Sequence, residues 1–283
     1  MATPIPVFYT PKMVADSRCA SPSAAKPVKV VESWQKQFLV DVIEPTPVTV
    51  DELSRAHARW YVDSILACEV DNGFDNRSPE VAASLPYTSG AMLSAARRAI
   101  QAKGVAAAPC SGFHHAGYER AEGYCTFNGL MVTALALKES GVKSVGILDL
   151  DMHYGNGTDD IIREVKAHDL IKHFTGGARY FDKVQAPDFF QRLPGVLESF
   201  AGCEVVLYQA GADPHVDDPY GGWLTTDELR WRDAMVFNAM KKMGVPVAWN
   251  LAGGYQTEKD GSIPKVLEIH DNTMRECVRV YGG

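Results

Sequence analysis

The chain has 283 residues, 46% of them hydrophobic, which is enough for one large buried core. Its formal net charge is −7 and Lys and Arg do not cluster, which argues against a nucleic-acid partner because phosphate binding needs concentrated positive charge. The six cysteines form no CxxC pair, so neither a disulfide framework nor a cysteine zinc site is indicated. Without a signal-peptide pattern or an apolar run near the roughly 20 residues of a membrane helix, we expect a cytoplasmic protein with no membrane partner.

The first hundred residues have mainly helical patterns. A loop rich in Pro, Ser and Ala over 15–27 precedes them, and it is too short to separate two domains. Apolar spacing then predicts helices over 33–44, 49–69 and 89–104. We expect one domain over residues 1–283.

From residue 105 onward, short apolar runs alternate with helical patterns. The apolar runs predict strands at 105–110, 144–150, 204–210 and 246–252, and the intervening helices are expected at 128–141, 158–168 and 225–244. This alternation is typical of an α/β fold with three layers (αβα) around a mostly parallel sheet. In such sheets ligands bind at the carboxyl ends of the strands.

Polar, glycine-rich loops follow all four predicted strands of this half of the chain. They read "SGFHHAGYERAEGYC", "DLDMHYGNG", "AGADPHVDDP" and "LAGGYQ". Because parallel strands end at one edge of a sheet, we expect these four loops to converge on one site.

Three residues in these loops are candidate metal ligands. Asp151 and His153 stand two apart after the second strand and can point to one side if the chain stays extended, and Asp213 follows the third strand. Two carboxylates and one imidazole suit Zn²⁺, with Fe²⁺ or Co²⁺ as alternatives, and leave a coordination position open. On the local pattern alone, DxDxH is more often a solvated turn. The metal site is favoured only because three other polar loops are expected at the same edge of the sheet.

Other loop residues suit acid–base chemistry. The adjacent His114 and His115 can take up and return a proton, although a lone loop histidine is more often structural. Asn156 can offer its amide to a neighbouring imidazole. Tyr255 follows two glycines and can aim its hydroxyl at a developing oxyanion, although "GGY" by itself is a weak signal and such a tyrosine usually packs.

Taken together, these motifs resemble the histone deacetylase family, including bacterial deacetylase-like amidohydrolases and acetylpolyamine amidohydrolases. The resemblance spans roughly 56–254 and includes "AHARWYVDSI" as the family's early helix. It implies an arginase/deacetylase-like fold and a zinc-dependent hydrolase of acetyl-lysine, acetylpolyamine or a related acylated amine. It also implies that Asp151, His153 and Asp213 bind the zinc and that Tyr255 stabilises the oxyanion.

The resemblance assigns further roles around this centre. Asp149 would orient His114, and Asn156 would orient His115, in the form seen in class II and bacterial relatives. A carboxylate beside His114 favours its protonated form, while a neutral amide leaves His115 the better base. For the substrate, Gly123 and Tyr124 in "EGYC" match one wall of the acyl-lysine channel, and Asp75 matches the rim aspartate, although a plain turn residue is at least as good an interpretation of Asp75.

Two features depart from the family pattern. Relatives bind K⁺ beneath the zinc loop with a serine from the next strand, where this chain has Ile171 or Lys172, so K⁺ is uncertain. We hypothesise that the Lys172 ammonium replaces the ion. The segment 174–187 lacks the family's Pro-Gly-Thr signature, which leaves Tyr180 and Phe181 as candidates for the second aromatic wall.

Two alternative functions remain open. One is an arginase-like manganese ureohydrolase, and the other is a catalytically silent homologue that binds an acylated ligand. The sequence favours small acylated amines over chromatin as substrate. It does not determine the acyl chain, the amine, or whether the protein forms a homo-oligomer.

Overall fold

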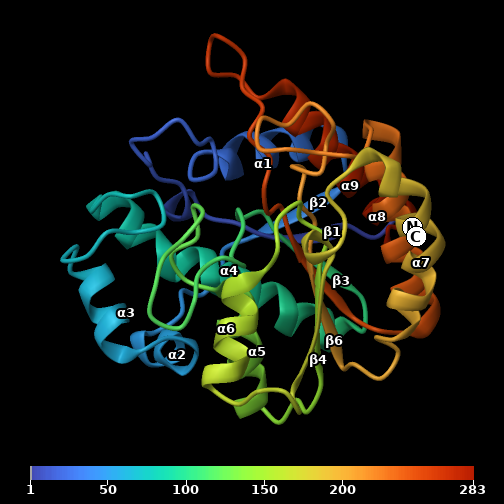
Figure 1. The fold of residues 1–283 in the computed structure, drawn as a ribbon. Helices are drawn as coiled ribbons and strands as arrows, with labels where there is room; N and C mark the ends of the chain where they lie inside the picture. The colour runs from blue at the N-terminus through green and yellow to red at the C-terminus, as the bar shows by residue number, and fades with distance from the viewer. Residues whose placement is uncertain (1) are drawn as a thin grey trace.

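The computed structural model describes residues 2–283, and its centre is one seven-stranded parallel sheet (Figure 1). The strand order is β2-β1-β3-β7-β6-β4-β5, and every pairing between neighbours is parallel. The strands are β1 (Ile5–Phe8), β2 (Val40–Ile43), β3 (Val105–Ala108), β4 (Val145–Asp149), β5 (Ile171–Thr175), β6 (Val205–Gln209) and β7 (Val247–Asn250). The predicted α/β fold with a parallel sheet is confirmed.

Helices cover both faces of the sheet and bury two apolar clusters. The first cluster lies under α2 (Val50–Ala56), α3 (Arg59–Leu66), α4 (Pro79–Ala102), α5 (Gly129–Glu139) and α6 (Asn156–Glu164). The second lies under α1 (Lys26–Gln37), α7 (Ala186–Glu198), α8 (Thr226–Met243) and α9 (Pro264–Tyr281). Because both faces are covered, β3, β4, β6 and β7 are completely buried, and they are apolar except at the carboxyl ends of the last three, which carry Asp149, Gln209 and Asn250.

Local sequence signals explain where several helices begin. Thr49 caps α2 and Thr225 caps α8, each in a capping box with a glutamate three residues later. Ser78 caps α4, and its side chain accepts a hydrogen bond from the backbone N–H of Val81. These caps satisfy backbone donors that a helix leaves unpaired at its first turn.

The first hundred residues differ from the sequence prediction in several places. The predicted helix over 33–44 ends at Gln37, and Val40–Ile43 forms strand β2. The predicted helix over 49–69 is two helices, because the chain is extended at His57 and Ala58 between them. Helix α4 begins ten residues before its predicted start, and β1, which contains Pro6, was not predicted at all.

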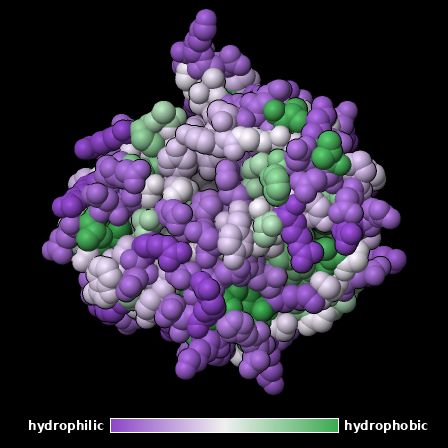
Figure 2. Space-filling view, in the orientation of Figure 1, coloured by the Kyte–Doolittle hydropathy of each residue, from purple (hydrophilic) through white to green (hydrophobic). Residues whose placement is uncertain are grey.

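The surface seen in Figure 2 is largely hydrophilic, with apolar residues scattered over it rather than joined in one patch. Across residues 2–283, the helices include none that combines the length and apolar composition of a membrane span.

Candidate active site

The four loops singled out in the sequence leave neighbouring strands. Strands β3, β7, β6 and β4 are adjacent in the sheet, so the loops that follow them emerge side by side at its carboxyl edge. Hydrogen bonds join the loops as well, because the backbone N–H of Gly253 donates to Asp151 Oδ2 (2.9 Å) and that of Met152 donates to Asp213 Oδ1 (3.3 Å). The expected convergence of the loops is observed.

Asp151, His153 and Asp213 come together as a possible metal site. Each offers one ligand atom, and these atoms all lie within 4.8 Å of one another. His153 Nδ1 is 3.0 Å from Asp213 Oδ2 and 3.3 Å from Asp151 Oδ1. The chain bends over residues 151–153 rather than staying extended, so the turn, and not strand alternation, brings Asp151 and His153 together.

The electrostatics of these three residues fit a divalent cation. Both aspartates are buried, and burial together with the neighbouring Asp151 carboxylate raises the pKa of Asp213 to about 7. Hydrogen bonds to the two carboxylates raise the pKa of His153 to about 11, which shows how strongly this spot attracts positive charge. A carboxylate–carboxylate–imidazole set suits Zn²⁺, Fe²⁺ or Co²⁺.

His114 is buried and is held by Asp149. Its Nδ1 is 2.6 Å from Asp149 Oδ2, so the ring donates that proton to the carboxylate. Burial opposes a charged ring, but the Asp149 and Asp151 carboxylates outweigh it and raise the pKa of His114 to about 9. Gln209 was missed in the sequence, although it ends β6: its amide donates to Asp149 Oδ1 (3.1 Å) and accepts from the backbone N–H of Phe113 (3.1 Å).

His115 has a different environment, because its partner is neutral. Its Nδ1 donates to Asn156 Oδ1 at 2.6 Å, and the Asn156 amide in turn donates to Glu122 Oε2 at 2.9 Å, which fixes the orientation of the amide. Burial and the adjacent His114, whose ring centroid is 4.1 Å away, lower the pKa of His115. The two histidines therefore favour opposite protonation states.

Tyr255 lines the same cavity as His115 and His153, and it follows a segment that requires glycine. A Cβ on Gly253 would lie 2.4 Å from Asp213 Cγ, so only glycine lets this loop approach the metal ligands. Burial and the Asp213 and Asp151 carboxylates raise the pKa of Tyr255 well above its usual range, so the phenol stays protonated. The backbone N–H of Tyr255 donates to Asp218 Oδ2 (2.9 Å), and sequence reasoning had not singled out Asp218.

A cavity of about 310 Å³ leads to these groups, and tyrosines dominate its wall. The Tyr124 and Tyr220 hydroxyls are 2.8 Å apart, and both rings lie close to Tyr255, with centroid separations of 5.5 and 4.9 Å. Gly123 and Asp75 also line the cavity. Gly123, at φ 55°, leaves room for the His115 ring, because a Cβ there would lie 2.5 Å from His115 Cδ2.

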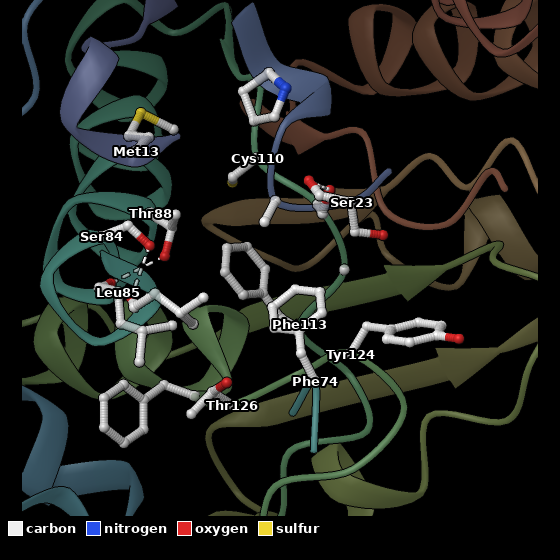
Figure 3. A pocket seen from close by; sticks show the side chains of 16 residues that line it. Met13, Ser23, Phe74, Ser84, Leu85, Thr88, Cys110, Phe113, Tyr124 and Thr126 are labelled. Carbon is white, nitrogen blue, oxygen red and sulfur yellow. Dashed lines mark hydrogen bonds between the residues drawn. The ribbon is translucent and has the colours of Figure 1, made fainter. Parts of the chain in front are cut away.

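A second, smaller cavity of about 50 Å³ lies behind Tyr124 (Figure 3). Phe74, Phe113 and Met13 contribute its apolar lining, and Figure 3 shows the Tyr124 hydroxyl pointing away from the other labelled side chains. Phe74 also packs against the Tyr124 ring at 5.8 Å between centroids. This cavity therefore backs the wall of the mouth and holds none of the three metal-ligand candidates.

The hypothesis that the Lys172 ammonium replaces a cation at Asp149 is wrong. The Lys172 ammonium lies over the Phe200 ring, 5.7 Å from its centroid, so it does not replace a cation at Asp149. His173 rather than Lys172 lies on the Asp149 side of β5, since a Cβ on Gly155 would lie 2.7 Å from Asp149 Oδ2 and 3.4 Å from His173 Nε2. Alternation along β5 explains the difference, because adjacent strand residues face opposite sides.

The second aromatic wall was also misplaced. Tyr180 is 5% exposed and stacks on Trp223 within the core, with 5.8 Å between ring centroids, and Phe181 is exposed without lining the mouth. Tyr220 faces Tyr124 instead. Tyr220 lies in the loop that follows Asp213, and nothing in the sequence "DDPYGG" indicates that this tyrosine lines the mouth of the cavity.

Comparison with known proteins decides the family. The family model described as "Histone deacetylase domain" matches residues 21–181, more than half of the chain. The chain belongs to the histone deacetylase family. The matched segment contains His114, His115, Asp151 and His153 and ends before Asp213 and Tyr255.

Individual deacetylase-family relatives match over different lengths. The acetylpolyamine amidohydrolase of Mycoplana ramosa is 40% identical over 184 residues, which cover 55% of this chain and 53% of the relative. Histone deacetylase 8 of Xenopus laevis is 26% identical over 66% of this chain and 70% of the relative. The match thus spans about half the length of the first of these proteins.

A structural comparison agrees with the family fold. The crystal structure of the HDA15 HD domain superposes with a TM-score of 0.77 at 19% identity, covering 98% of this chain and 92% of that one. At this identity the likeness concerns the fold, and it extends beyond the segment that the family model matches.

Proposed function

We propose that this chain is a metal-dependent amidohydrolase that removes an acyl group from a small amine. The observation that carries the proposal is the convergence, at one cavity, of three metal-ligand candidates with two histidines of opposite electrostatic character and a protonated tyrosine. Zn²⁺, or Fe²⁺ or Co²⁺, held by Asp151, His153 and Asp213 would supply Lewis acidity and lower the pKa of water.

The histidines divide the proton transfers between them. His115 is the base, because burial and its neutral Asn156 partner keep the ring unprotonated and able to accept a proton from water. It then returns this proton to the departing amine nitrogen. His114, held by the Asp149 carboxylate, remains positively charged and offsets the negative charge that develops at the reacting carbonyl.

Tyr255 stabilises the oxygen of the reacting carbonyl by donating its hydroxyl proton. Its raised pKa keeps that proton in place at neutral pH. Asp218 holds its backbone N–H, and the Tyr124 and Tyr220 rings pack against its ring, which restricts the direction of the hydroxyl before substrate binds. The products are a carboxylate and a free amine.

The mouth favours a narrow, flexible substrate. Tyr124 and Tyr220 present aromatic faces to an alkyl chain, and the Asp75 carboxylate at the same cavity suits a cationic amine at the far end. The relative named acetylpolyamine amidohydrolase supports a small acylated amine, and the relatives named histone deacetylases support acyl-lysine as the alternative. We favour the small amine.

Acetate release is the experiment that tests this function. Acetylputrescine and an acetyl-lysine peptide are incubated with metal-loaded protein, chelated protein and Tyr255→Phe. Removing one oxyanion donor lowers kcat by about 100-fold to 1,000-fold in well-studied hydrolases, and we expect a loss of this size. Tyr87→Phe, on α4, is the matched control and should retain full activity.

Two results would contradict the proposal. Metal-loaded protein that binds an acylated amine without releasing acetate would indicate a silent ligand-binding homologue. Urea release from arginine would indicate a ureohydrolase, a class that uses two metal ions, whereas within residues 2–283 one group of three such ligands is found.

A further inference from the structure

Arg232 is a fully buried cation on α8, on the face of the helix that packs against the sheet. Its side chain is 0% exposed, which is unusual for arginine unless it is paired, and Nε and Nη1 have hydrogen-bond partners while Nη2 has none within residues 2–283. Nε donates to Asp233 Oδ1 at 2.8 Å. Asp233 in turn accepts hydrogen bonds from the Tyr208 and Thr273 hydroxyls, so the carboxylate that holds Arg232 is itself fixed by β6 and α9.

The other end of the guanidinium binds the two loops that carry the metal-ligand candidates. Nη1 donates to the carbonyl of Leu150 at 3.0 Å and to the carbonyl of Gly211 at 2.8 Å. Leu150 directly precedes Asp151, and Gly211 lies two residues before Asp213. One nitrogen atom therefore joins the ends of β4 and β6 immediately before both carboxylates.

The space between these loops leaves little freedom for other arrangements. A Cβ on Gly211 would lie 2.6 Å from Asp213 Oδ1 and 2.9 Å from Asp151 Oδ2. A small shift of either carbonyl would therefore move both carboxylates relative to each other. Hydrogen bonds that fix metal ligands in this indirect way commonly change metal affinity by about 10-fold to 100-fold when they are removed.

We infer that Arg232 is a positioning residue for the metal site: its guanidinium fixes the spacing of Asp151 and Asp213 by holding the carbonyls of Leu150 and Gly211 together. The inference rests on the metal-dependent function proposed above. Arginine suits this role because its rigid fork binds the Asp233 carboxylate and the two carbonyls at once. A lysine keeps the charge beside Asp233 but has a single nitrogen for all three partners.

Arg232→Lys is the informative variant, because it leaves no uncompensated carboxylate in the core. Arg230→Lys is its matched control: it makes the same replacement two residues earlier on α8, where the guanidinium pairs with Glu276 and binds neither carbonyl. Two measurements are made on wild type and both variants. Co²⁺ affinity is measured by visible absorption, and amide hydrogen exchange of segments 150–153 and 210–213 is measured on the metal-free proteins.

We expect Arg232→Lys to weaken Co²⁺ binding by about 10-fold to 100-fold and to accelerate exchange in both segments by about tenfold, while Arg230→Lys stays within about twofold of wild type in both measurements. Exchange and affinity within twofold of wild type in Arg232→Lys would overturn the inference, as would equal effects of the two variants. Failure of wild type to bind Co²⁺ would overturn the proposed function instead, and the exchange data would then decide on the positioning role alone.

Discussion

His57 should make the stability of this fold depend on pH. The ring lies between α2 and α3, is 0% exposed, and bridges two segments near the site. Its Nδ1 is 2.9 Å from the carbonyl of Gly117, and its Nε2 accepts the backbone N–H of Asn128 at 2.9 Å. Since Nε2 accepts, the folded state requires the neutral ring, and burial lowers the pKa of His57 to about 4.

The size and sign of the effect follow from this pKa. An unfolded histidine has a pKa of about 6.5, so each pH unit between about 6.5 and 4 favours unfolding by up to about 1.4 kcal/mol as the unfolded chain takes up a proton. The His57 contribution is complete above pH 6.5 and is lost as the pH falls toward 4. At pH 5 the loss is about 2 kcal/mol.

His57→Gln removes this titration, and urea unfolding of the metal-free protein at pH 7.5, 6 and 5 measures it. Wild type should be the more stable protein at pH 7.5, and its advantage should shrink by about 2 kcal/mol at pH 5. His168→Gln, at an exposed position, is the control, and its stability difference from wild type should be the same at all three pH values. A gap between wild type and His57→Gln that stays constant with pH would refute the reasoning.

Three further predictions concern the site. Tyr220→Ala should raise KM for an acylated amine by about fivefold with little change in kcat, because it removes an aromatic wall worth about 1 kcal/mol. Tyr220→Phe keeps the ring and should have a smaller effect, and equal kinetics for all three proteins would argue against the wall. Asn156→Asp should shift the acidic limb of the kcat/KM profile to higher pH, because a carboxylate raises the pKa of His115 and the base must be unprotonated. An unshifted limb would contradict the role of His115 as base. Removing the metal with a chelator should lower the melting temperature, since metal at 100 times its Kd stabilises the folded state by about 2.7 kcal/mol. Identical melting curves with and without chelator would argue against a bound metal.

The four buried strands that carry the site could be predicted because their signals are local, whereas α7 and α9 were not predicted. The buried strands β3, β4, β6 and β7 read as short apolar runs, and each is followed by a polar loop whose place depends only on the strand end. The first half was harder, because β2 follows α1 after two residues and β1 carries a proline. Apolar periodicity alone therefore predicts one helix that continues from α1 across the two intervening residues into β2.

The site residues in strand-end loops could likewise be predicted, while their supports could not. Gln209, Glu122 and Asp218 act through hydrogen bonds to partners 34 to 60 residues away in the chain, or in the case of Asp218 through the Tyr255 backbone. No spacing rule reports such contacts. The buried Arg232 is the clearest case, since on sequence alone an arginine in "ELRWRDAM" is indistinguishable from an exposed helix residue.

The strand order has a consequence for how the chain folds. Strand β7 is the last of the seven in sequence and yet stands in the middle of the sheet, between β3 and β6. Until residues 247–250 are available, β2-β1-β3 and β6-β4-β5 can form only as two half-sheets with open inner edges at β3 and β6. Such edges invite pairing with other chains. Synthesis therefore passes through a long interval in which most of the protein exists without its central strand, and we expect dependence on chaperones to be greatest there.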